Sequence, residues 1–135
     1  MPTLLETASE LDRLLSDGWA GATPIAVDNV PFKEVPGQSY LSTKFIPYTT
    51  ENVVIGSNMC KRKRTIGVFN IRIRTPLEQG IGKAYSLAND IQNIMDNQCI
   101  LPNLFTLASS IRRVGDEEDG WYSLICGVPF TSDDT

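Results

Sequence analysis

Histidine is absent from this chain of 135 residues, and its absence removes much of the chemistry open to a small protein. Histidine is the usual general base of catalytic triads and the commonest protein ligand of metals. The cysteines are odd in number and contain no close-spaced pair, unlike a zinc site or a disulfide framework: Cys60, Cys99 and Cys126. We therefore expect free thiols, with Cys126 in a buried strand, and neither a metal nor a cofactor.

Long apolar runs and an excess of positive charge are also missing. No stretch approaches the roughly 18 apolar residues that cross a membrane, and the N-terminus lacks the basic and apolar regions of a signal peptide. Sixteen acidic and twelve basic residues give a net charge of −4, so nucleic acid and anionic lipid should repel the protein as a whole. We expect no membrane association, a cytosolic location and one domain spanning residues 1–135.

Three short patterns resemble active sites, and each lacks a required part. The Gly80–Lys83 stretch is similar to a phosphate-binding loop, but it lacks the first glycine and the hydroxyl residue that should follow the lysine. The acidic run 116–119 lacks the alternating ligands of a calcium loop. The cysteines have no base to activate them. The sequence therefore predicts a protein that is not an enzyme.

The spacing of apolar residues predicts two helices and several strands. Steps of three and four residues indicate a helix over 4–17, ended by Gly18, and a second helix over 84–96. Strands are predicted at 24–28, 39–48, 52–56, 64–75, 104–114 and 121–130, with a frayed tail at 131–135. Two helices cannot cover both faces of such a sheet. We expect an α+β fold with a mixed or antiparallel sheet of about five to six strands, two helices on one face, and a second face that is polar or meets another subunit.

Charged residues give the candidate binding sites. Four consecutive cations lie between two strand patterns and are predicted to form an exposed hairpin loop: Lys61, Arg62, Lys63 and Arg64. This loop is a solvated tip, a docking site for an acidic protein surface, or a contact for nucleic acid phosphates. No aromatic residue lies among the cations to stack on bases, which counts against nucleic acid.

A second charged group is predicted at the sheet. Arg72 and Arg74 share one face of the strand 64–75, and the pair Arg112 and Arg113 adds further positive charge. These arginines are expected to pair across a subunit interface with an acidic hairpin. Its carboxylates are Asp116, Glu117, Glu118 and Asp119.

Five segments, taken in order, carry a resemblance to a known family. They are the opening helix closed by Gly18-Trp19, the segment 23–32, the strand 67–75 followed by Pro76 and a glycine-bearing linker, the helix 84–95, and the long hairpin 105–130. Over nearly the whole chain they resemble the tail terminator proteins of long-tailed bacteriophages. The cationic run 61–64 matches no fixed motif of that family.

The resemblance implies a structural α+β subunit with no catalytic residues. It implies a hexameric ring that caps the tail tube, stops tube polymerisation and offers a surface to the head-side connector. The location implied is the head-proximal end of the virion tail, with DNA passing through the lumen unbound, and the host cytoplasm during assembly. The alternatives are another neck or tail-completion adaptor, a tube subunit, a small nucleic-acid-binding module using the loop 61–64, and, last, an enzyme.

Overall fold

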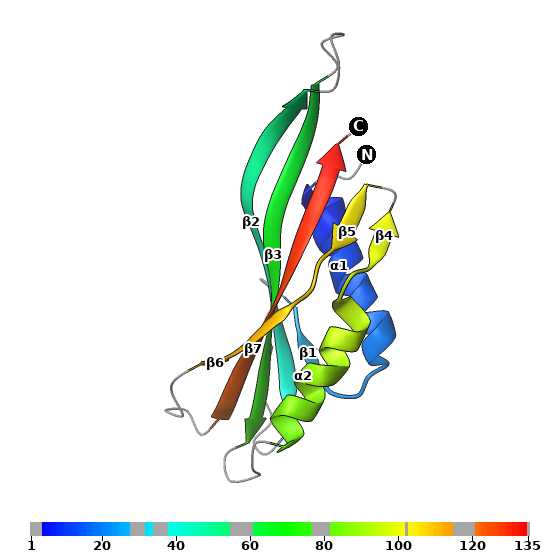
Figure 1. Cartoon of the computed structure of the whole chain (residues 1–135). Coiled ribbons are helices and arrows are strands. Elements are labelled where there is room, and N and C mark those ends of the chain that lie inside the picture. The colour runs from blue at the N-terminus through cyan, green and yellow to red at the C-terminus, as the bar shows by residue number, and fades with distance from the viewer. Residues whose placement is uncertain are drawn as a thin grey trace.

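A computed structural model describes residues 4–27, 32–33, 38–54, 61–76, 82–101, 103–114 and 121–134. The elements, in chain order, are α1 (Leu4–Trp19), β1 (Ile25–Ala26), β2 (Tyr40–Val54), β3 (Lys61–Pro76), α2 (Gly82–Met95), β4 (Cys99–Leu101), β5 (Leu104–Thr106), β6 (Ser110–Val114) and β7 (Trp121–Asp134). The strands form one sheet in the order β1-β2-β3-β7-β5-β4, with β6 also paired to β7. Both helices lie on one side of this twisted sheet (Figure 1). The predicted α+β fold is confirmed.

The described sheet has seven strands and is mixed, because β1 runs parallel to β2 while the other pairs are antiparallel. The core lies between the helices and one face of this sheet. The alternation predicted for β3 is confirmed, since Phe69, Ile71 and Ile73 are almost completely buried. They pack in one cluster with apolar residues of both helices, which include Leu11 and Ile91.

The end of α1 differs from the prediction. The helix continues past Gly18 to Trp19, and the chain turns at Ala20 and Gly21, whose φ angles are +52° and +75°. Gly18 serves close packing instead, because a Cβ atom there would lie 2.6 Å from a methyl group of Ile94 on α2. The buried Trp19 donates a hydrogen bond from Nε1 to the Thr23 hydroxyl at 3.0 Å, which ties the helix end to the segment before β1.

The strands predicted at 39–48 and 52–56 are one continuous strand, β2, so the predicted break between them is wrong; residues 55–56 lie outside the described residues. A register shift between Pro47 and Thr49 accommodates the proline, and pairing with β3 continues to Val54. Gly67 permits this close approach. A Cβ atom at Gly67 would lie 2.4 Å from the Ile46 carbonyl oxygen and 2.7 Å from the Phe130 ring.

The hairpin formed by β2 and β3 therefore extends further than the sequence indicated. The backbone of all four cations lies in β3, from Lys61 paired with Val54 to Arg64 paired with Glu51, and not in a loop as predicted. The cationic segment lies in a strand because β2 continues past Pro47, and this continuation gives the segment a strand to pair with.

The C-terminal part also differs from the prediction. The expected strand 104–114 is two strands, β5 and β6, separated by three residues outside the ladder, and the short strand β4 was not predicted. The tail does not fray in the described residues, since β7 continues to Asp134 and pairs there with Lys63. The long β3 strand supplies the backbone partners that keep this end of β7 in the sheet.

Candidate assembly surfaces

The face of the sheet opposite the helices is named here the open face. Its central side chains, placed there by strand alternation, come from β2, β3, β6 and β7: Ser42, Lys44, Ile46, Val68, Asn70, Arg72, Arg112 and Ile125. Two adjoining hollows of about 290 and 230 Å³ lie on it and share Asn70 and Ile125. Both described helices pack against the other face (Figure 1). The open face is thus a broad surface that no described helix covers.

Positive charge gathers at the centre of the open face. Arg72 lies opposite Ile125 on β7, and Ile125 lies opposite Arg112 on β6, so the two arginines are about 10 Å apart across two strand spacings. Lys44 lines the same hollow as Arg72. The Nε atom of Arg72 is buried and has no hydrogen-bond partner among the described residues. A protein of net charge −4 therefore carries a concentrated basic area on this face.

Arg74 sits at one end of the open face and is held by aromatic residues. Its Nη1 donates to the Tyr40 hydroxyl at 3.2 Å, and the Tyr40 ring meets the Trp121 ring edge-on with centroids 5.3 Å apart. Tyr40 and Trp121 are both buried. Arg74 is therefore held by a hydrogen bond within the subunit, whereas Arg72 lines the larger of the two hollows on the open face.

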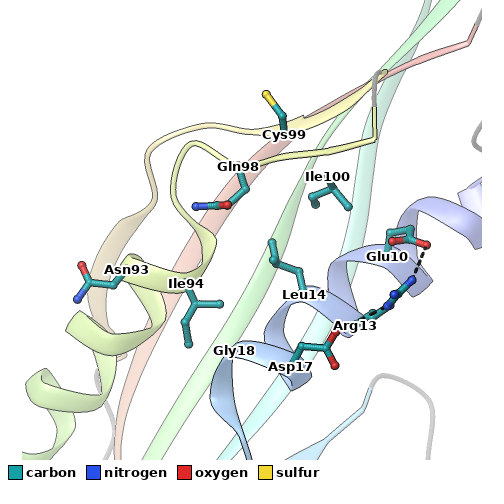
Figure 2. A pocket seen from close by; sticks show the side chains of 10 residues that line it. All are labelled: Glu10, Arg13, Leu14, Asp17, Gly18, Asn93, Ile94, Gln98, Cys99 and Ile100. Carbon is teal, nitrogen blue, oxygen red and sulfur yellow. Dashed lines mark ion pairs between the residues drawn. The ribbon is translucent and has the colours of Figure 1, made fainter.

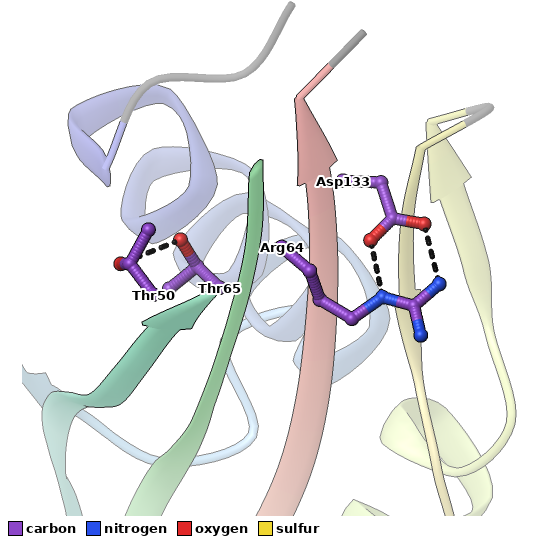
Figure 3. A network of polar contacts seen from close by, with 4 residues as sticks. All are labelled: Thr50, Arg64, Thr65 and Asp133. Carbon is purple, nitrogen blue, oxygen red and sulfur yellow. Dashed lines mark hydrogen bonds and ion pairs between the residues drawn. The ribbon is translucent and has the colours of Figure 1, made fainter. Parts of the chain in front are cut away.

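Arg64 marks the opposite end of the sheet and forms an ion pair within the subunit. Its Nε and Nη2 donate to the two carboxylate oxygens of Asp133 at 2.7 and 3.1 Å, which joins β3 to β7 (Figure 3). The hydroxyls of Thr50 and Thr65 meet nearby at 3.2 Å. Arg64 thus stabilises the sheet. The side chains of Lys61, Arg62 and Lys63 lie outside the described set.

The structure separates the two arginines of β6. Arg113 points to the helix side, where its guanidinium lies 5.2 Å from the centroid of the Tyr122 ring, and Arg112 lines the open face. The acidic run of Asp116, Glu117, Glu118 and Asp119 lies outside the described residues. Sequence reasoning missed Lys44, although this residue lies in the strand predicted at 39–48 and the alternation Ser42-Lys44-Ile46 places it on one face of that strand.

A second surface lies between the helices and is named the α1–α2 groove. It has a volume of about 480 Å³ and is lined by Glu10, Arg13, Leu14, Asp17, Gly18, Asn93, Ile94, Gln98, Cys99 and Ile100 (Figure 2). Arg13 lies 3.7 Å from Glu10 and 3.7 Å from Asp17, and all three side chains keep solvent contact. Such exposed pairs contribute little to stability. Helix α1, which borders the groove, is acidic, since it carries four carboxylates and a single cation, Arg13.

Neither described cysteine forms a disulfide bond: Cys99 is exposed in the groove, and Cys126 is buried in β7, as predicted. Burial raises the pKa of the Cys126 thiol, a hydrogen bond with Ser109 opposes that rise, and the nearby Asp96 carboxylate adds to it. Within the described ranges, no three potential ligands gather into a metal site. No helix in that part of the chain is long and apolar enough to span a membrane.

Comparison with known proteins identifies the class of this fold. One solved chain matches with a TM-score of 0.64 and 20% identity, covering 96% of this chain and 93% of its own. A chain from the virion of a native gene transfer agent particle matches with a TM-score of 0.56 and 15% identity, covering 93% of each chain. At these identities the likeness concerns the fold. A comparison with curated protein sequences gave no match.

The sequence itself decides the family. Residues 7–130 match the family described as phage tail terminator protein, which is most of the chain. The members are structural proteins of the virion without enzymatic activity. The chain belongs to the phage tail terminator family. It is therefore a structural component of a virion tail, associated with the tail tube, and the predicted family and the absence of catalysis are confirmed.

Proposed function

We propose that this protein forms a hexameric ring on the head-proximal end of the finished tail tube. The ring stops tube polymerisation and offers the surface to which the head-side connector joins. Two observations support this: the family match over residues 7–130 and a sheet face that the subunit's own helices leave uncovered. Subunits joined by two different surfaces close into a ring when their rotation allows it. Assembly takes place in the host cytoplasm, and residues 1–135 act as one domain.

The charge of the ring suits a passage for DNA. Six copies at −4 each give about −24, so the ring as a whole repels phosphates despite the basic area on each subunit. We propose that DNA crosses the lumen without specific binding. A short labelled duplex at about 150 mM salt tests this by fluorescence anisotropy, and tight binding lost on neutralising Lys61, Arg62, Lys63 and Arg64 would favour the nucleic-acid-binding alternative.

The ring and the terminator role are tested by removing the protein from particle production. We expect headless tails, with tubes longer than the normal length, and restoration of joined particles of normal length by added protein. Electron microscopy of the restored tails should show a six-fold layer at the tube end nearest the head. Tails of normal length joined to heads in the absence of the protein would contradict the proposed function.

A further inference from the structure

We propose that the open face of one subunit packs against α1 and the α1–α2 groove of the next subunit. The proposal names the contact by which the ring closes, and it rests on the ring proposed above. The occupant of the open face is thus a second copy of this chain. Among the described side chains, no carboxylate lies at the centre of this face beside the basic area.

Charge complementarity selects the occupant. The open face carries Lys44, Arg72 and Arg112, and none of them forms an ion pair with a described residue. The matching surface must then be acidic. Helix α1 carries four carboxylates and one cation on its 16 residues; Glu10 and Asp17 line the groove, whereas Asp12 accepts a hydrogen bond from Thr43 of β2. Opposite potentials on two surfaces favour their encounter and fix their relative position.

Apolar side chains complement each other on the same two surfaces. On the sheet, Tyr48 is 66% exposed beside Arg112, and Ile66 is 38% exposed on the neighbouring strand. On α1, Leu5 is 76% exposed and Leu4 is 51% exposed. Exposed apolar side chains that lie together and are rimmed by polar residues mark interaction sites. Their burial in a subunit contact would supply the apolar part of the interface.

The positions of the two surfaces give the contact its direction. The open face and the helices lie on opposite sides of the sheet (Figure 1), so one subunit cannot use both surfaces toward the same neighbour. The contact is therefore heterologous: each subunit presents its open face to one neighbour and α1 to the other. A contact of this kind propagates and closes into a ring when the rotation between neighbours allows it, whereas a two-fold contact stops at a dimer.

Charge reversal on each surface provides the test. The face variant is Arg72→Glu with Arg112→Glu, and the helix variant is Glu10→Lys with Asp17→Lys. A control variant with the same net charge change as the face variant is Lys83→Glu with Arg113→Glu, since neither residue belongs to the open face. Circular dichroism melts establish that each variant folds. The readout is the fraction of terminator-free tails that acquire the six-fold layer, measured against subunit concentration by electron microscopy.

We expect each reversed surface to raise the concentration for half-capping by at least about tenfold, and the control to change it by less than about twofold. A chain carrying both reversals should recover, because its acidic face then meets a basic helix. An equal mixture of face variant and helix variant should also cap tails, because alternating subunits place a basic face on an acidic helix at one contact and an acidic face on a basic helix at the next.

The outcomes separate this contact from the ring itself. If the wild type forms no six-fold layer, the proposed function fails. If the layer forms and the face variant caps normally, only the contact proposed here is wrong. If the face variant fails and the doubly reversed chain does not recover, the open face binds a tube protein or nucleic acid, and a second copy is excluded as its occupant.

Discussion

The two faces of the sheet use the same strands and differ in almost everything else. In β3, the residues on the helix side are buried and apolar, as Ile71 and Ile73 show. Their immediate neighbours on the open face are polar or charged and half-buried, as Asn70 and Arg72 show. One face holds the subunit together by apolar burial. The other contributes less to folding, and its charges remain available for a second molecule.

The largest effect should come from a matched pair of substitutions on the two faces. Ile71→Ala on the core face should reduce the free energy of unfolding by about 3–4 kcal/mol, because a cavity forms in a fully buried site. Ile125→Ala, on the next strand but on the open face, should cost only about 1 kcal/mol, because this side chain is half-buried in the free subunit. Urea denaturation measures both. Equal losses would remove the distinction between the faces.

The close approach at the register shift gives the next largest effect. Gly67→Ala should destabilise the subunit by about 2–3 kcal/mol, since the new methyl group meets the Ile46 carbonyl and the Phe130 ring. Gly82→Ala at the start of α2 is the control, because nothing lies within 4 Å of the added atom. Thermal melts compare the two variants. A Gly67→Ala protein as stable as the control would show that β2 and β3 are not in tight contact there.

The ion pair at the end of the sheet should contribute a smaller amount. Asp133→Asn removes the charge that receives two hydrogen bonds from Arg64, and we expect a loss of about 1 kcal/mol that shrinks at high salt. Asp90→Asn on the exposed side of α2 serves as the control, with a change within about 0.5 kcal/mol. Denaturation at low and high salt checks both values. A loss unaffected by salt would point to a cause other than charge.

The smallest effect is a pH dependence from the core. Burial raises the pKa of Cys126, so the unfolded chain loses this proton first once the pH passes the ordinary value of 9.0. The free energy of unfolding should therefore fall more steeply above this pH in the wild type than in Cys126→Ala. Urea denaturation series through that range compare them. Parallel curves would show that the thiol is not shielded.

In a Cys60→Ser background at neutral pH, a thiol reagent should label Cys99 quickly and Cys126 only after unfolding.

The sequence pattern predicts the helices and the core well, because both depend on local periodicity. Regular spacing of apolar residues placed α1 and α2 within about two residues of their observed ends, and alternation assigned the two faces of β3. The continuation of β2 through Pro47 was not predictable in this way. It depends on a glycine of the partner strand, Gly67, which only long-range pairing brings next to the proline.

The candidate sites also depend on long-range strand pairing, which local sequence patterns do not predict. The grouping of Arg72 with Arg112 needs the register of three strands, and the ion pair of Arg64 with Asp133 joins residues 69 positions apart in the sequence. Sequence patterns had added Arg112 and Arg113 together to the positive charge of Arg72 and Arg74, without separating the two, and they did not indicate the ion pair. The run of charges was misleading. It drew attention to the residues 61–64 as a loop, while tertiary pairing placed them in a strand. Charge patterns became informative only after the faces of the sheet were known.

The central claim is that the sheet's open face is kept for assembly at the end of the tail tube. Electron cryomicroscopy of intact particles, with the density fitted by this subunit, tests it directly. The account predicts a six-fold layer at the head-proximal end of the tube in which Arg72 and Arg112 are buried against α1 of the next subunit. A layer in which the open face remains in contact with solvent, or the absence of this subunit from the tube end, would contradict it.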